Sequence, residues 1–461
     1  MLTAFYALVI AIWFAVAYVS LPRRRRIGLL ESPAPVPAGL LLAYFNLPFL
    51  FLVERTNGTA VLEQGLSISN LLAIGVVGLS AIYLARETWN GGGILHLPSD
   101  RVVFPFSLAI AFALLTTLWS VVPTYTLYRA TELATLFAIC FLLLDRERFG
   151  PTFIVFFAVF IATWLLGSLD TIASHLASGI FVSSAKNNMT PLMCLAALLY
   201  LYLFPQTIRH RKAVALLFVV GFIAGGSAAT TASVPLIFTG LMAASSNPFV
   251  RRVGWFAAIA YFALIIFLLG SLRQFPEIME GISQLLQKPI AELEKNTGRS
   301  EFWPAYIEAG SGRLFGAGFA AGERFIQLVD ADVTRRVLGD VDQLIRSAHN
   351  TFIGAWITMG WVGICLLNLI LGSAVITASR LDSRSRAFVY GVVFLLAANG
   401  MTTPGVLSEF NEHTMTLAAV LAFLRNRLAR SEALERPCAP SFTTVPAPSN
   451  SRLHIRPIGN L

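Results

Sequence analysis

Long apolar stretches recur along nearly the whole chain and are separated by short polar segments. An apolar helix needs about 20 residues to cross the hydrocarbon core of a bilayer, and about thirteen stretches approach that length. They are residues 3–21, 35–53, 69–85, 102–120, 130–144, 151–168, 188–204, 213–227, 231–244, 253–271, 351–377, 387–402 and 412–425. Two of them, 213–227 and 231–244, are short, and a re-entrant pair is the alternative to two spans there. The pattern predicts an all-α, polytopic integral membrane protein with about 12–13 transmembrane helices.

The composition agrees with this prediction. Hydrophobic residues make up 56% of the chain and charged residues only 13%, whereas an ordinary soluble domain carries about 25% charged residues. The net charge of +9 does not indicate nucleic-acid binding, because the arginines lie in short clusters between apolar stretches. Four cysteines, Cys140, Cys194, Cys365 and Cys438, show no spacing typical of disulfides or metal sites.

The basic residues predict how the spans alternate. If the N-terminus lies outside, every inner loop carries a basic cluster, as the positive-inside rule requires. These clusters contain Arg23 to Arg26, Arg86, Arg101, Arg146, Arg148, Arg209, Arg211, Lys212, Arg251, Arg252, Arg380, Arg384, Arg386, Arg425, Arg427 and Arg430. The short outer loops hold almost none, namely Arg55, Arg129 at a boundary and Lys186.

The first apolar stretch, Leu2–Leu21, precedes its basic cluster. A cleavable signal peptide carries its positive charge before the apolar run. The order therefore predicts a retained anchor with its N-terminus outside.

One polar segment is much longer than the others. Residues 272–350 hold nine Lys or Arg and eleven Asp or Glu, and a loop of this length is not governed by the charge rule. The alternation places it outside. We therefore expect an N-terminal transmembrane bundle over 1–271, a large outside loop with short helices over 272–350, and C-terminal transmembrane helices over 351–427. Residues 428–461, rich in Pro and Ser, are expected to form a disordered cytoplasmic tail.

The outside loop contains two predicted helices. Apolar residues at helical spacing predict one over 276–288, lying on the membrane surface or packing on the loop itself. Thr297 or Ser300 is expected to cap a second helix that ends near Gly310. Arg299 then lies near a helix N-terminus, a position that attracts anions, and its guanidinium suits a phosphate. The alternative is an arginine paired with Glu301 or Asp332.

The loop ends at Ser347–Thr351, where Asn350 is a good N-cap for the next span. His349 then lies at the outer membrane boundary beside a helix N-terminus, where a neutral imidazole is favoured and can accept a proton from a hydroxyl. The alternative is an interfacial histidine that bonds a carbonyl. Of the six histidines, only His175, His349 and His413 are expected outside, and His413 is a second candidate.

At these residues the sequence resembles the O-antigen ligase and polymerase superfamily. The matching residues are Gly298-Arg299, Trp303, Gly316-x-Gly318, His349-Asn350 and Gly360 to Gly363; before them come Trp119-Ser120, Pro123, Leu127 and Arg129, and Lys186-Asn187-Asn188 after Gly179 and Phe181. From the residues alone, the Gly-x-Gly turn is equally compatible with a ligand-facing and a packing role. The Lys-Asn segment favours the exopolysaccharide polymerase-like branch.

The resemblance implies a GT-C-like, metal-independent glycosyltransferase without a cofactor, in the bacterial inner membrane. It polymerises or ligates a glycan that is delivered on undecaprenyl diphosphate at the outer face, and the acceptor is a glycan or a lipid. The bilayer, a chain-length regulator and a flippase are its implied partners. Carried over, Arg299 holds the diphosphate and His349 assists the acceptor hydroxyl. The implied substrate-binding residues are Lys186, Arg129, Trp303, Asn350, Gly316 and Gly318.

The sequence departs from the family at one position. Many members carry an arginine in the segment that corresponds to Ser227–Thr231, and the matching residue here is Thr230. We hypothesise that Lys186 or Arg129 supplies the missing charge. The competing interpretations of the chain are a transporter or flippase, which would carry ionisable residues inside its spans, and a structural or signalling membrane scaffold.

Overall fold

The computed structural model describes residues 35–51, 67–89, 98–146, 149–167, 190–225, 228–271, 277, 280–281, 299–338 and 348–435. Within these ranges the chain is all-helical and contains no strand. Its longer helices are α3 (Pro35–Phe51), α5 (Ile68–Trp89), α6 (Phe104–Leu115), α7 (Pro123–Arg146), α8 (Phe149–Gly167), α10 (Thr190–Leu203), α11 (Arg211–Gly225), α12 (Ala228–Ala243), α13 (Pro248–Ser271), α20 (Thr351–Ala378), α21 (Ser383–Asn399) and α22 (Glu412–Glu435). Each predicted apolar stretch from 35–53 onward overlaps one of them, and the stretch 3–21 lies outside the described residues.

Five of these helices, α5, α7, α8, α13 and α20, are long and apolar enough to cross a membrane. Two of them bury little of their surface, because only 28% of the apolar window of α5 and 11% of that of α13 is buried inside the molecule. Large side chains such as Ile82, Phe256 and Ile259 are exposed on these two helices. Such apolar surfaces suit contact with lipid, and the described fold is that of a polytopic, all-helical membrane protein.

Several helices begin at residues that favour a helix start. Proline lies at the first position of α7 and α13, where its missing N–H is not needed. Asn350 caps α20, since its Oδ1 accepts hydrogen bonds from the N–H groups of Phe352 and Ile353. Asp382 caps α21 in the same way. These caps satisfy backbone donors that have no partner inside the helix.

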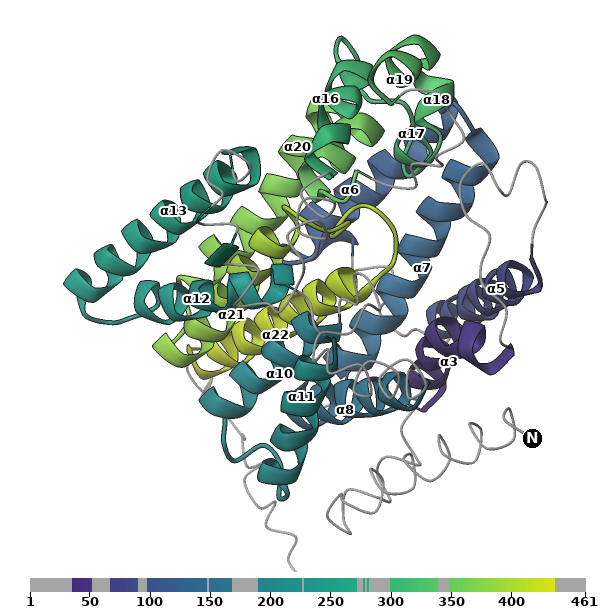
Figure 1. Ribbon diagram of the computed structural model, residues 1–461. Coiled ribbons are helices and arrows are strands. Elements are labelled where there is room, and N and C mark those ends of the chain that lie inside the picture. Colours follow the sequence, from purple (N-terminus) through teal and green to yellow (C-terminus); the bar gives the residue numbers. More distant parts are fainter. Residues whose placement is uncertain are drawn as a thin grey trace, which may run out of the picture.

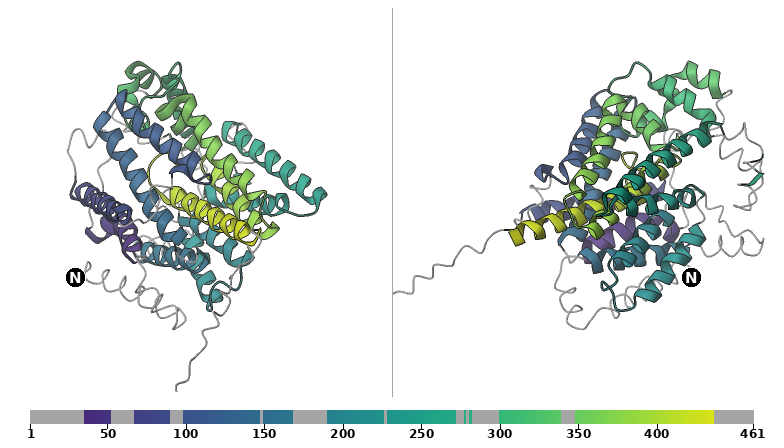
Figure 2. Two further views of the ribbon diagram at one scale, coloured as in Figure 1. Left: turned by 180° about the vertical axis from the view of Figure 1, so that it is seen from behind. Right: turned by 90° about the vertical axis from the view of Figure 1, so that its left-hand side faces the viewer.

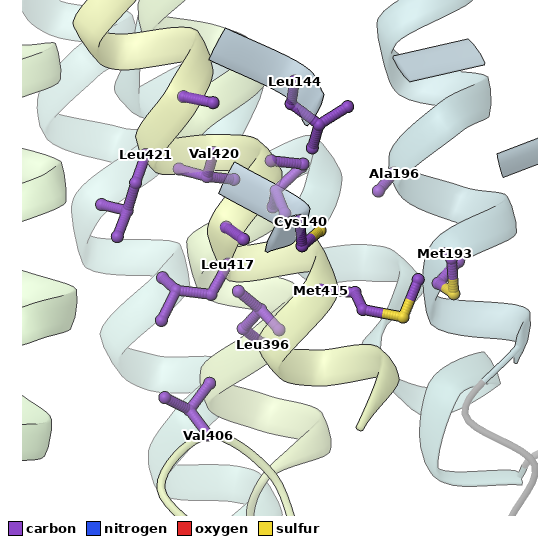
Figure 3. Close-up of a cluster of buried hydrophobic side chains, with 14 of the residues drawn as sticks. Cys140, Leu144, Met193, Ala196, Leu396, Val406, Met415, Leu417, Val420 and Leu421 are labelled. Atoms are coloured by element: carbon purple, nitrogen blue, oxygen red, sulfur yellow. The ribbon is translucent and has the colours of Figure 1, made fainter. Parts of the chain in front are cut away.

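The helix α22 runs through the middle of the bundle, between α7, α8, α10, α20 and α21 (Figure 1). Every residue from His413 to Leu424 is buried. Figure 3 shows Leu417 and Val420 of this helix close to Cys140 of α7 and Leu396 of α21. Residues 351–427 therefore pack into the N-terminal helices as one bundle.

The short helices of the predicted outside loop gather at one end of the bundle. They are α16 (Arg299–Gly310), α17 (Ala321–Arg324), α18 (Ile326–Val329) and α19 (Ala331–Leu338). They lie over the ends of α6, α7 and α20, and the further views place them at the same end (Figure 1, Figure 2). We call this the loop end. The helix predicted to stop near Gly310 is α16, and most of the predicted helix 276–288 lies outside the described residues.

Polar contacts define the opposite end of the bundle, which we call the arginine end. There Arg425 of α22 forms ion pairs with Asp100 before α6, at 3.0 Å, and with Asp145 near the end of α7, at 2.6 Å. Arg101 pairs with Glu432 of α22. The predicted alternation of the spans places these segments on one side, and the contacts agree with it.

The two short stretches, 213–227 and 231–244, contain separate helices with different neighbours: α11 packs on α8 and α10, whereas α12 packs on α13 and α21. The choice between two spans and a re-entrant pair stays a prediction. The packing of α11 is tight at Gly221, because a Cβ atom there would collide with the side chains of Ile161 and Cys194. In addition, α22 continues to Glu435, so the first residues of the predicted tail are helical; residues 436–461 lie outside the described part.

Candidate functional site

Two motif segments that are about 200 residues apart in the sequence are joined at the loop end. The N–H of Val121 donates to the carbonyl of Ala317 at 3.1 Å. The Thr126 hydroxyl donates to the Phe319 carbonyl, and the Phe319 N–H donates to the Thr116 hydroxyl, both at 2.9 Å. The Trp-Ser segment and the Gly-x-Gly turn therefore form one hydrogen-bonded unit.

The Gly-x-Gly turn also fills a kink in α20. Gly360 has φ +65° inside this helix, which interrupts the helical hydrogen bonds. The carbonyls of Ile357 and Thr358 accept hydrogen bonds from the N–H groups of Ala317 and Gly318, at 2.9 and 3.0 Å. The turn thus satisfies acceptors that the kink has freed.

The space around Gly316 and Gly318 is occupied by protein. Both have positive φ, and a Cβ atom would collide with the Thr358 backbone at Gly316 and with Ser120 at Gly318. Only glycine fits such positions without strain. The structure therefore favours the packing role of this turn over the substrate-binding role expected for the two glycines.

His349 lies in a segment that is fixed on both sides. The indole N–H of Trp303 donates to the carbonyl of Ala348 at 2.9 Å, and the Ala348 N–H donates to Oε1 of Glu323 at 2.8 Å. After His349, the Asn350 side chain caps α20 and its amide donates to the Met401 carbonyl at 2.9 Å. His349 itself has φ +47°, a left-handed conformation that costs a non-glycine residue about 1–2 kcal/mol. The backbone that carries its half-buried imidazole is thus held in place by the surrounding contacts.

A cluster of charged side chains lies beside this segment. Nη1 of Arg129 lies 2.8 Å from Oε2 of Glu132 and 3.6 Å from Oε2 of Glu409. The Arg324 guanidinium lies 3.1 Å from Oε1 of Glu409. Two arginines therefore share the carboxylate of Glu409. We call Arg129, Glu132, Arg324 and Glu409 the arginine–glutamate cluster.

Tyrosines complete the cluster inside the bundle. The hydroxyls of Tyr44 on α3 and Tyr128 on α7 donate to Oε1 of Glu132, at 2.7 and 2.9 Å. Nε of Arg129 donates to the hydroxyl of Tyr125 at 3.1 Å. Glu132 is fully buried and Arg129 is 7% exposed, while the Glu409 side chain is 27% exposed. The cluster therefore opens toward solvent on the side of Glu409.

The helix α17 connects the cluster to His349. Its Glu323 bonds the residue before His349, and the next residue, Arg324, pairs with Glu409. Burial alone would lower the pKa of Arg324, but the carboxylate of Glu409 and other neighbours raise it above the usual arginine value. Arg324 therefore carries its charge at every physiological pH.

Sequence reasoning named Arg129 as a candidate site residue but did not name Arg324, Glu323 or Glu409 as candidates; it noted Glu409 only as a neighbour of His413. Their signal was present, because Glu323-Arg324 is a charged pair within the mostly apolar run from Leu314 to Val329. A charged pair in such a run requires partners. Those partners come from distant segments, so the sequence alone could not name them.

The remaining predicted site residues are Arg299, Lys186, Trp303 and Asn350. Arg299 is the first residue of α16, and its side chain lies outside the described part, as does all of Lys186. Trp303 and Asn350 hold the segment around His349. Their expected contact with a substrate stays a prediction.

The second histidine candidate and the departure at Thr230 belong to one buried network. Asn399 donates to the Thr230 hydroxyl at 2.6 Å, and its Oδ1 lies 3.1 Å from Nε2 of His413. His413 is fully buried, so the structure favours a structural role for it. Thr230 is 1% exposed.

Among the described residues, no group of three His, Cys, Asp or Glu is arranged to hold a metal ion. No protein-family model matches the sequence, and neither does any curated protein sequence.

Proposed function

We propose that this protein is a GT-C-like glycosyltransferase of the inner membrane that polymerises or ligates a glycan carried on undecaprenyl diphosphate. The observation that supports this most is the pair Arg129 and Arg324, which converge on Glu409 beside the segment that fixes His349. Two guanidinium groups suit a diphosphate. An imidazole nearby suits the activation of a hydroxyl.

The orientation follows from charge. The inner loops of the predicted topology carry the arginine clusters, and the positive-inside rule places the arginine end in the cytoplasm. The loop end then faces away from the cytoplasm. A lipid-linked glycan presented at the outer surface of the membrane would meet the arginine–glutamate cluster there.

The proposed reaction is a displacement at the anomeric carbon of the donor glycan. The acceptor hydroxyl attacks this carbon and gives its proton to the imidazole of His349. The bond between the anomeric carbon and the diphosphate oxygen breaks, and undecaprenyl diphosphate leaves with the bonding electrons. Arg129 and Arg324 stabilise the negative charge that develops on the leaving group, which is the main electrostatic requirement of this step.

Arg324 changes our hypothesis about the position of Thr230. The arginine expected there by resemblance is replaced by a threonine whose hydroxyl is engaged by Asn399. We now propose Arg324 as the partner of Arg129 in binding the diphosphate. Lys186 and Arg299 remain proposed contacts to the donor, and the Lys-Asn segment favours a polymerase over a ligase.

The test is production of surface polysaccharide in a host whose own copy of the gene is deleted. We expect His349→Ala and Arg324→Gln to abolish long-chain polysaccharide while the protein accumulates normally in the membrane. Arg336→Gln is the matched control, because Arg336 lies in the same loop segment and forms an exposed ion pair with Glu308. Normal chain length with His349→Ala at wild-type protein levels would overturn the proposed mechanism.

A transporter or flippase is the second candidate, and one observation favours it. Arg129 and Glu132 are ionisable residues buried inside the candidate span of α7, and such residues often mark a transport pathway. Reconstituted vesicles separate the two. A transferase extends or transfers the glycan without moving the donor across the bilayer, whereas a flippase changes the leaflet of an unmodified donor.

A further inference from the structure

A pocket of about 420 Å³ lies at the arginine end, far from the candidate site. Its wall comes from the start of α8, the end of α10 with the turn that follows, the start of α21 and the last turns of α22. Its size is within the range of ligand pockets. Nothing in the proposed reaction uses it.

The polar lining of this pocket is strongly basic. Arg384, Arg427 and Arg430 line it, and among the described residues no aspartate or glutamate does. Their guanidinium groups form no ion pair within the described part of the chain, whereas the neighbouring Arg425 is paired with two carboxylates. Asp382 faces Arg427 but accepts the N–H groups that open α21. The pocket therefore presents three cations to whatever enters it.

Aromatic rings hold the central cation. The Arg427 guanidinium carbon lies 5.0 Å from the ring centre of Phe204 and 5.2 Å from that of Phe423. A guanidinium that rests on rings keeps its N–H edge available for an anion. Phe149, Tyr200 and Leu203 add further apolar surface to the lining. The pocket thus combines an anion-binding rim with an apolar floor.

This combination matches a phosphate on an amphiphile better than a free phosphate ion. A small hydrophilic anion gains nothing from the rings and leucine of the floor. A lipid headgroup offers a phosphodiester to the arginines while its glycerol and first methylenes contact the apolar lining. Basic pockets between helices at the cytoplasmic side of a membrane are typical positions for anionic lipid headgroups.

We propose that the pocket between α8, α10, α21 and α22 binds the phosphate headgroup of an anionic phospholipid. This function is independent of the glycosyl transfer proposed for the loop end. The bound headgroup would join the cytoplasmic ends of four helices. Two of these helices, α21 and α22, carry the buried Asn399 and His413 nearer the loop end.

The test uses the full-length protein in vesicles of phosphatidylcholine and phosphatidylglycerol. After mild extraction, native mass spectrometry counts the lipids that each protein molecule retains. We expect the wild type to retain phosphatidylglycerol in preference to phosphatidylcholine. The double variant Arg384→Gln/Arg430→Gln should retain about tenfold less phosphatidylglycerol, since hydrogen bonds between charged groups contribute at least a tenfold factor. Both side chains are exposed and neither rests on a ring, so the fold should persist.

The matched control is Arg251→Gln/Arg252→Gln, which removes the same charge from exposed residues at the start of α13 outside the pocket. An equal loss of lipid in this control would indicate general surface adsorption and would overturn the proposal. Equal retention of both lipids by the wild type would also overturn it.

A second experiment compares the melting temperature of the protein in detergent with phosphatidylglycerol and with inorganic phosphate. Stabilisation by inorganic phosphate alone would assign the pocket to a soluble phosphate compound and overturn the lipid assignment.

Discussion

Arg324 and Glu409 lie 85 residues apart in the sequence and form an ion pair, with 3.1 Å between Nη2 and Oε1. The same carboxylate lies 3.6 Å from Arg129. A phosphate group entering the site would compete with Glu409 for both arginines. Under the proposed function, Glu409 is therefore the counter-ion that the donor phosphate would displace.

Neutralising the two partners of this pair should have opposite effects on phosphate binding. We expect Arg324→Gln to weaken binding of undecaprenyl diphosphate to the purified protein about tenfold or more, through loss of a charged hydrogen bond. Glu409→Gln should leave binding unchanged or strengthen it, because it removes the competitor. Fluorescence or calorimetric titration with this lipid measures both. A similar loss of binding in both variants would indicate that the pair serves only the fold.

The carboxylate of Glu323 should matter for the shape of the segment around His349 rather than for its charge. Glu323→Gln keeps an oxygen for the Ala348 N–H, so we expect a free energy of unfolding close to that of the wild type. Glu323→Ala leaves that buried N–H without its acceptor and should cost about 1–3 kcal/mol. Hydrogen exchange at residues 348–350 should rise in the alanine variant alone. Equal exchange in both variants would contradict the role given to this contact.

The kink of α20 requires a glycine. Gly360→Ala should destabilise the protein by about 2–4 kcal/mol, because the new Cβ collides with the Leu314 carbonyl and φ is positive. Gly372→Ala on the same helix is the control, since nothing lies within 4 Å of its Cβ position. It should be neutral or stabilise by up to about 1 kcal/mol. Thermal unfolding in detergent distinguishes them, and equal melting temperatures would show that the kink is dispensable.

Restoring the arginine of the resembled family at Thr230 should fail. The site is buried and its hydroxyl accepts a hydrogen bond from Asn399, so a guanidinium there would lack space and a carboxylate. We expect Thr230→Arg to lower the yield of folded protein several-fold, in line with the cost of burying an unpaired charge. Thr230→Ser keeps the hydroxyl and should fold normally. Size-exclusion profiles in detergent report the outcome, and a well-folded Thr230→Arg would mean that this position opens to a cavity.

Hydropathy predicted the helices well, because lipid-facing and core side chains are both apolar. It failed at the start of α7, which was expected at residue 130 and begins at Pro123. The polar residues Arg129 and Glu132 belong to this helix, and their burial is compensated by their own ion pair and by contacts with tyrosines and Glu409. A single sequence shows that such charged residues are present. It does not show which residues of distant helices become their partners.

The candidate site was predicted in part. The motif residues located the segments that meet, as the bonds between 116–126 and 317–319 demonstrate. The motif residues did not show which side chains would contact a ligand and which only fix the backbone around it. Gly316 and Gly318 pack into the kink of α20, so their role follows from the positive φ of Gly360. The local sequence around Gly360 does not predict that conformation.

The buried position of α22 has a consequence for how the protein is made. Among the described helices, this one follows all the others in chain order, yet its residues 413–424 fill the middle of the bundle. The earlier helices must therefore insert before α22 does. Until α22 inserts, the side chains that pack against it lack their partners. The assembly step that closes the bundle is also the step that brings Glu409 to Arg129 and Arg324, so the site matures only at the end of biogenesis.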